Sequence, residues 1–184
     1  YDKNQQNLTN ICALINSIYI FFNIYWKEAN MNNSYIINKN TLLIKSTIDK
    51  KGVVIFDDKK TINLDIILHK FINDCCKYYG NSYKGKFESS KIYLNKNIKL
   101  PIIISENYEL IIFPTNSIRN PNCIWIVYNN IDNIKKLDNK NTIIIFKNGI
   151  EFCVNCSYNV INNQINNCAR LKCVLIERKR ALNV

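Results

Sequence analysis

The chain has 184 residues and a formal net charge of +11, from 25 Lys and Arg against 14 Asp and Glu. A chain of this length forms one domain with its own core, so it needs no disulfide or metal to fold. The eight cysteines are therefore not read as a small disulfide framework, and with no signal-peptide pattern they are expected to be reduced thiols in a cytoplasm. The positive charge predicts a polyanionic partner. Nucleic acid is the first candidate, and an anionic membrane surface is the second.

The N-terminal segment differs from the rest of the chain. Its two lysines are balanced by one Asp and one Glu, so the whole charge excess lies in residues 31–184. The one methionine is Met31, and we expect residues 1–30 to be a non-native upstream extension ahead of a single domain over residues 31–184. A docked or membrane-associated helix is the alternative, because residues 11–26 are apolar and aromatic. That run is shorter than the roughly 20 residues that span a bilayer, so no membrane partner is expected.

Short β-branched runs separated by turn residues predict strands along the remainder. The runs TLLIKST and VVIF flank residues 49–52, and LPIIIS and YELIIF flank Glu106 and Asn107. CIWIVY follows alone, and TIIIFK and IEFCVN flank Asn148 and Gly149. Because Asn-Gly supplies the two positive-φ residues of a type I′ turn, the last pair predicts the clearest β-hairpin.

Two helices are predicted among these strands. Apolar residues recur at helical spacing through residues 64–79, and Gly80 follows as the residue that ends the helix in a left-handed conformation. The second helix, over residues 157–176, has apolar residues on one side and a basic C-terminal end. The expected fold class is α+β, a mainly antiparallel β-sheet with two helices.

The stretch after the first helix contains half of the chain's glycines. Only four glycines occur in the chain, and Gly85 follows Gly80 by five residues, with small polar residues, a tyrosine and two lysines around them. Such a loop can approach phosphates closely or enter a narrow groove. An ordinary solvated turn is the alternative, since exposed Lys and Asn are common on any surface.

Four segments in a fixed order form a larger pattern. Cys76 precedes the glycine loop, the segment from Pro101 through residues 109–126 contains Phe-Pro-Thr and Cys-x-Trp-Ile, and Ser-Tyr-Asn is followed by Asn-Gln near the C-terminus. This pattern resembles that of the ComK family, competence transcription factors of low-GC Gram-positive bacteria, over roughly residues 34–175. The residues that carry it are Tyr79, Gly80, Ser82, Tyr83, Gly85, Pro114, Thr115, Cys123, Trp125, Asn163 and Gln164.

The resemblance implies a sequence-specific transcriptional activator of genes for DNA uptake. It implies binding to double-stranded DNA at paired A/T-rich boxes, largely through the minor groove, by a homodimer that assembles on the promoter, with RNA polymerase as an indirect partner and no cofactor. Two departures stand out. Lys86 occupies a position where Arg is usual, which removes a planar bidentate donor. The sequence ends at Val184 without most of the longer tail through which family members reach a Clp adaptor, which argues against adaptor-controlled degradation.

The candidate DNA contacts follow from charge and turn chemistry. The minor groove of an A/T tract is narrow and strongly negative, so slim cationic and amide side chains suit it. Two arginines of the basic C-terminal helix are expected at phosphates rather than at bases. The candidate contacts are Asn81, Ser82, Lys84, Lys86, Arg119, Arg170 and Arg178.

Two other classes of site compete with this interpretation. Cys153, Cys156, Cys168 and Cys173 could form a zinc site, but the first pair lies on a predicted strand without the glycine of a zinc knuckle, so buried thiols are favoured and no metal is expected. The single histidine, His69, has no nucleophile motif beside it, so no enzyme is expected. The alternative function is a degenerate or non-specific basic nucleic-acid-binding protein, with or without structural zinc.

Overall fold

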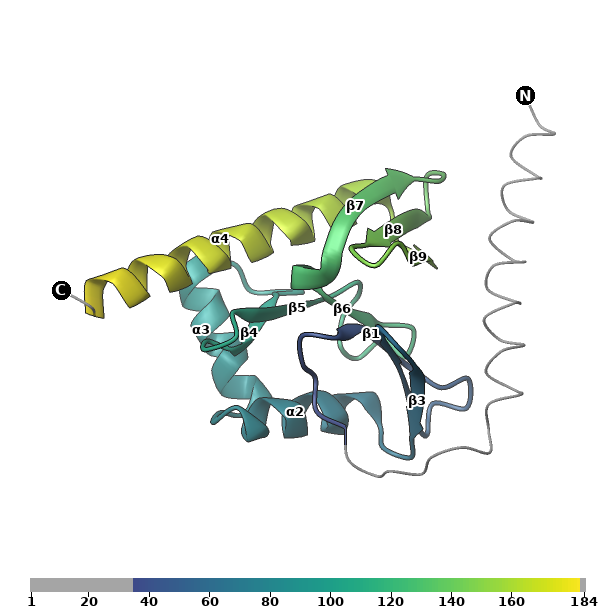
Figure 1. The fold of residues 1–184 in the computed structure, drawn as a ribbon, viewed down its shortest axis with the longest axis horizontal. Helices are drawn as coiled ribbons and strands as arrows, with labels where there is room; N and C mark the ends of the chain where they lie inside the picture. The colour runs from purple at the N-terminus through teal and green to yellow at the C-terminus, as the bar shows by residue number, and fades with distance from the viewer. Residues whose placement is uncertain (1–34, 183–184) are drawn as a thin grey trace.

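The structure is a computed structural model that describes residues 35–182, and the expectations about residues 1–30 lie outside that range. The described chain combines β-strands, three α-helices and one short 3-10 helix (Figure 1). The strands are β1 (Thr41–Ser46), β2 (Val53–Asp57), β3 (Thr61–Leu64), β4 (Ile102–Ser105), β5 (Leu110–Pro114), β6 (Ile124–Val127), β7 (Ile131–Lys136), β8 (Thr142–Phe146) and β9 (Glu151–Val154). The helices are α2 (Leu68–Tyr78), α3 (Tyr83–Leu94) and α4 (Tyr158–Leu182), and η1 (Tyr128–Asn130) is the 3-10 helix.

The strands form two antiparallel sheets. The larger has the order β3-β2-β1-β6-β5-β4, and the smaller has the order β7-β8-β9. Every pair of neighbours is antiparallel. The predicted class, α+β with mainly antiparallel sheet, is confirmed.

The large sheet lies between two apolar layers. Because side chains alternate along a strand, Ile44 of β1 packs in the core with α2, whereas its neighbour Leu43 packs in the core with α4 and the small sheet. Figure 1 shows this order, with α2 on one side of the large sheet and α4 with the small sheet on the other. Helix α3 connects the two sides beside edge strand β4, which it contacts.

The hairpin at Asn148 and Gly149 is confirmed, but its predicted turn type is wrong. Gly149 has φ of +83°, whereas Asn148 does not have a positive φ, which a type I′ turn requires at both positions. The Gly149 amide donates to the Phe146 carbonyl at 2.8 Å, and the Phe146 amide donates to the Ile150 carbonyl at 2.9 Å. These bonds make a three-residue loop in which glycine alone takes the left-handed conformation.

The first helix is shorter than predicted. Leu64 belongs to strand β3, where it pairs with Val53 of β2, so helix α2 begins at Leu68 rather than at residue 64. Leu64 matched the helical pattern because it precedes Leu68, the first residue of α2, by four residues, although it belongs to a strand. Strand β7 was not predicted either, because its six residues, IDNIKK, are mostly polar and exposed.

Helix α3 was not predicted. Residues 81–86, expected to be a loop, contain its N-cap, Ser82, and its first turn. Only Ser90 and Leu94 of α3 are buried, so its apolar residues do not form the stripe by which α2 was recognised. Helix α4 runs to Leu182, six residues beyond its predicted end. None of the helices in residues 35–182 is long and apolar enough to span a bilayer.

Candidate nucleic-acid interface

The junction of α2 and α3 is a short corner in which both helix ends are capped. Gly80 has φ of +88° and donates its amide to the Lys77 carbonyl, while the Asn81 amide donates to the Cys76 carbonyl, which is the Schellman arrangement expected at this helix end. One residue later, the Ser82 hydroxyl accepts from the Gly85 amide at 3.2 Å and caps α3. The predicted role of Gly80 is confirmed, and only two residues separate the C-cap of α2 from the cap of α3.

Gly85 has a packing role. It lies in the first turn of α3, and a β-carbon added there would collide with the side-chain amide of Asn81. The Asn81 Oδ1 accepts from the Ser82 amide at 2.8 Å, which holds the Asn81 side chain over the start of the helix. The two closely spaced glycines therefore have different roles. Gly80 ends α2 in a left-handed conformation, and Gly85 leaves room for the Asn81 side chain against the first turn of α3.

Two lysines occupy the first turn of α3. Lys84 is exposed and Lys86 is half-buried, and the turn contains no acidic residue. Cations at a helix N-terminus run against the helix dipole, which favours negative charge there by roughly 0.3–1 kcal/mol per group. This arrangement costs stability unless an anion binds, so the turn is suited to a phosphate.

A second polar turn, over residues 115–123, shares a core with the first turn of α3. The Tyr83 ring packs edge-on against the ring of Trp125 with centroids 6.1 Å apart, and burial, together with the nearby Cys123 thiol, raises the pKa of Tyr83 to about 12. Ile118 packs in the same core as Tyr83. Tyr83 and the loop over residues 115–123 therefore contribute to one core, and this loop carries the exposed Arg119.

We call the set of polar and charged residues that these two turns contribute the α3 corner. Its members are the predicted contacts Asn81, Ser82, Lys84, Lys86 and Arg119. The Ser82 hydroxyl is already engaged in the helix cap. Lys84 and Arg119 are the exposed cations of the set, so they are the members best placed for a polyanion.

The other predicted arginines lie elsewhere. Arg178 Nη1 is 2.5 Å from the Tyr93 hydroxyl and 3.8 Å from Glu106 Oε1. Tyr93 is ten residues after Tyr83, so about 15 Å along α3 from the α3 corner at 1.5 Å per residue. Arg170 is exposed on α4. Four of the seven predicted contacts therefore lie together at the start of α3, Arg119 lies on the 115–123 loop, and the other two arginines lie on α4.

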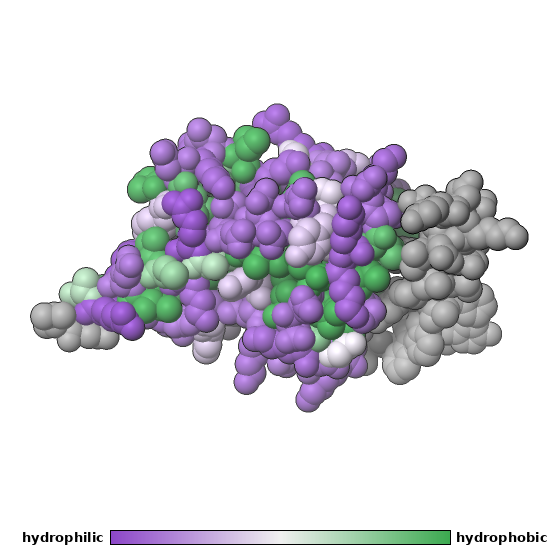
Figure 2. All heavy atoms as spheres, turned by 90° about the horizontal axis from the view of Figure 1, so that it is seen from above, coloured by the Kyte–Doolittle hydropathy of each residue, from purple (hydrophilic) through white to green (hydrophobic). Residues whose placement is uncertain are grey.

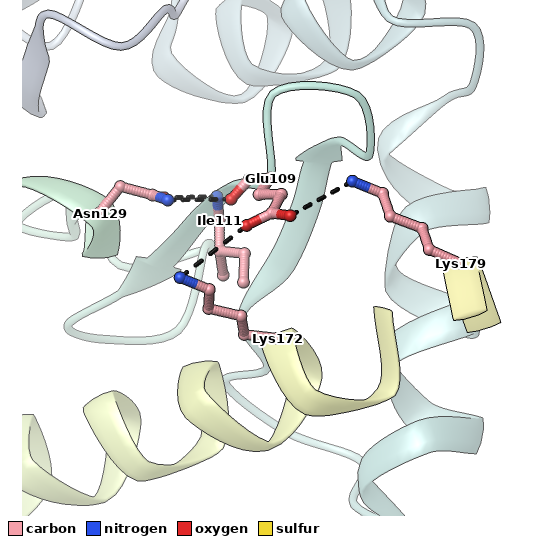
Figure 3. Close-up of polar contacts among 5 residues, drawn as sticks. All are labelled: Glu109, Ile111, Asn129, Lys172 and Lys179. Carbon is pink, nitrogen blue, oxygen red and sulfur yellow. Dashed lines mark hydrogen bonds and ion pairs between the residues drawn. The ribbon is translucent and has the colours of Figure 1, made fainter. Parts of the chain in front are cut away.

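The basic end of α4 is partly neutralised. Glu109 at the β4–β5 turn lies 3.8 Å from Lys172 Nζ and 3.3 Å from Lys179 Nζ (Figure 3). Asn129 holds that turn, because its Nδ2 donates to the Glu109 carbonyl and its Oδ1 accepts from the Ile111 amide. The predicted basic helix end is thus docked on the large sheet, with fewer free cations than its sequence indicates.

Most of the remaining pattern residues build the core and its connections. Tyr79 donates its hydroxyl to the Ile37 carbonyl, and the Thr115 hydroxyl accepts from the Ile124 amide. Gln164 Nε2 donates to the carbonyls of Lys99 and Pro114 at 2.7 and 2.9 Å. Cys123 and Trp125 are fully buried, whereas Asn163 is exposed.

Three lysines that make long-range contacts were not among the predicted site residues. Lys96 Nζ binds Asn167 Oδ1 at 2.8 Å, and the Lys99 carbonyl binds Gln164, so both lysines lie beside α4. Lys45 extends between two phenylalanine rings, where burial lowers its pKa. Sequence position carries no signal for such contacts, because each joins elements far apart in the chain.

The candidates for metal and acid-base chemistry have other surroundings. In residues 35–182 no three His, Cys, Asp or Glu side chains are placed to hold a metal ion. Cys156 and Cys168 pack in the core on the α4 side of the large sheet, and burial raises the pKa of each thiol. His69 packs edge-on against Tyr83, with centroids 6.0 Å apart.

Comparison with known proteins identifies the family to which this chain belongs. The model of the ComK protein family matches residues 32–180. The chain is similar to the competence transcription factor of Bacillus subtilis (strain 168), with 26% identity over 129 residues, which cover 70% of this chain and 64% of that protein. No solved structure matches. Since the family match spans most of the sequence and agrees with the pattern around the α3 corner, the chain belongs to the ComK protein family.

Proposed function

We propose that this protein is a sequence-specific transcriptional activator of competence genes that binds A/T-rich boxes of duplex DNA largely through the minor groove. Membership of the ComK family and the name of its Bacillus subtilis relative support a transcription factor rather than an enzyme. The proposed protein acts in the cytoplasm as a homodimer on the promoter, with RNA polymerase as an indirect partner.

The α3 corner is the observation that carries this proposal. It combines exposed Lys84 and Arg119 with the amide of Asn81, and no acidic residue occurs in the first turn of α3. Slim cationic side chains suit the narrow, negative minor groove of A/T tracts. The helix N-terminus adds partial positive charge that a backbone phosphate would complement.

The second candidate is non-specific binding of nucleic acid. The net charge of +11 favours it, because electrostatic contacts alone bind any duplex. The two candidates differ in whether affinity depends on base composition, whereas both predict loss of affinity at high salt.

A gel-shift titration of the full chain separates them. The probes are a duplex with two A/T boxes and a G/C-rich duplex of the same length, each with and without a minor-groove-binding drug. Selective binding to the A/T duplex that the drug abolishes supports the proposal. Equal, salt-sensitive binding to both duplexes supports the non-specific candidate instead.

Matched variants locate the interface. Lys84→Ala/Arg119→Ala removes two exposed cations from the α3 corner, and Lys59→Ala/Lys60→Ala removes two exposed cations from the β2–β3 turn at the opposite edge of the large sheet. The corner variant should lower the slope of log affinity against log salt by about 2, at roughly 0.9 for each phosphate that is no longer neutralised. The control should leave the slope unchanged, and equal effects of the two variants would place the interface elsewhere.

A further inference from the structure

Strand β7 forms an edge of the small sheet. The sheet has the order β7-β8-β9, so β7 pairs with β8 on one side, and within residues 35–182 no strand pairs with its other side. Most of its residues are exposed, and such an edge can accept a further strand. We propose that β7 pairs antiparallel with β7 of a second copy of this chain, and that this pairing joins the homodimer. The inference rests on the proposed function, which includes that dimer.

The backbone of β7 directs hydrogen-bonding groups away from the sheet. The Leu137 amide donates to the Asn141 carbonyl across the β7–β8 hairpin at 3.2 Å. Since the backbone groups of an antiparallel strand point alternately toward and away from the neighbouring strand, those of Lys135 point toward β8 and those of Ile134 point away. The Ile134 amide accordingly donates to Oδ1 of the adjacent Asn133 at 2.8 Å rather than to a strand. Ile134 is therefore the residue at which a second strand would pair.

A two-fold axis fixes the register of that pairing. The same edge of both copies takes part, so one residue lies opposite its own copy. With Ile134 on the axis, its outward amide and carbonyl exchange two hydrogen bonds with those of the second copy. Lys136 then lies opposite Asp132 of the second copy, and the symmetric pair forms at the other end of the strand.

Charge selects this register over its neighbours. Within residues 35–182 neither Asp132 nor Lys136 belongs to an ion pair, and both are exposed. A shift by two residues in one direction places Lys135 opposite its own copy, and a shift in the other direction places Asp132 opposite Ile134. Opposite charges across two strands stabilise their pairing and like charges destabilise it. The edge is thus complementary to itself in the register centred on Ile134.

The rest of the surface limits this contact to a small dimer interface. The register of β7 with β8 shifts between Ile131 and Asn133, so Asp132 is the extra residue of a bulge, and a bulge interrupts regular pairing. Figure 2 views the molecule from the side of α4 and the small sheet, where the surface is mainly hydrophilic with smaller apolar patches. Backbone and charged groups therefore make the contact, and two DNA boxes that hold two copies close together strengthen it.

Charge reversal tests the pairing. Lys136→Asp places two carboxylates opposite each other at both ends of the strand pair, and Asp132→Lys places two ammonium groups there. The double variant Asp132→Lys/Lys136→Asp restores opposite charges without changing the net charge. Lys51→Asp, an exposed lysine of the β1–β2 turn in the large sheet, is the control that matches Lys136→Asp in charge. Sedimentation of each full-length protein over a wide concentration range measures self-association, and circular dichroism checks that each variant is folded.

The expected result is loss and rescue of association. Each single reversal should weaken the dimer by at least about 10-fold, because two symmetric pairs change from attraction to repulsion. The double variant and the Lys51 control should associate within about 3-fold of the parent. In the gel shift, cooperative binding to a duplex with two A/T boxes should follow the same order, whereas affinity for a duplex with one box should not.

Three results would overturn the inference. They are a parent with neither self-association nor cooperative binding to two boxes, a single reversal that associates as the parent does, and a double variant as weak as the single reversals. Each leaves the proposed function to the A/T selectivity of the parent. A parent that dimerises through β7 but binds A/T-rich and G/C-rich duplexes equally would overturn the proposed function and support this interface.

Discussion

The buried amide of Gln164 joins α4 to the segment before β4 and to the end of β5. Its side chain is 4% exposed, and its Nε2 donates to the carbonyls of Pro114 and Lys99. Gln164→Leu keeps a similar volume and removes both donors. A buried carbonyl left unpaired costs about 1–3 kcal/mol, which applies to Pro114, and the partly exposed Lys99 bond contributes about 0.5–1.5 kcal/mol.

One effect offsets part of this loss. Gln164 Oε1 is buried without a hydrogen-bond partner among the described residues, and leucine removes that atom. The expected net decrease in the free energy of unfolding is therefore about 1–3 kcal/mol, a large part of the roughly 5–15 kcal/mol by which domains are stable.

Urea denaturation followed by circular dichroism measures this decrease. Asn163→Leu, an exposed change at the preceding position of the same helix, is the control and should alter stability by no more than about 0.5 kcal/mol. A Gln164→Leu protein as stable as the parent, or a control that is destabilised as much, would refute the view that these two bonds hold α4 in place.

Three further outcomes follow from the same structure. Glu109→Gln should lower stability by up to about 1 kcal/mol in low salt and less in high salt, seen in urea midpoints, because its charge faces two lysines of α4. At pH 8 iodoacetamide should label exposed Cys173 but not Cys123, whose pKa burial raises to about 11 so that it stays a thiol, and mass spectrometry would read this. Gly85→Ala should displace the Asn81 side chain and weaken DNA binding in the gel shift, with stability changed by less than about 1 kcal/mol because alanine favours the helix.

A specific result would contradict each of these three predictions. A stability loss in the Glu109 variant that does not depend on salt would mean that packing, not charge, is responsible. Equal labelling of the two cysteines would place Cys123 at the surface. Unchanged DNA binding by the Gly85 variant would show that the Asn81 amide is not part of the interface.

Local sequence patterns determined much of this fold. The β-branched runs predicted most strands of both sheets, because buried strands need apolar residues wherever they lie. Gly80 predicted the end of α2, since a left-handed residue is a local requirement of that helix end. The pattern spread over four segments also identified the family, and nearly all of its members prove to be caps, hydrogen-bonding residues or core.

Only the tertiary structure decided the rest. Strand β7 and helix α3 have weak patterns of their own, and they form because neighbouring elements pair with them or pack against them. The contact between the first turn of α3 and strand β6 is made by Tyr83 and Trp125, which lie far apart in the chain. The rotation of α4 likewise follows from its packing on the sheet. Local spacing specifies which residues can share a face, but only long-range packing specifies what that face meets.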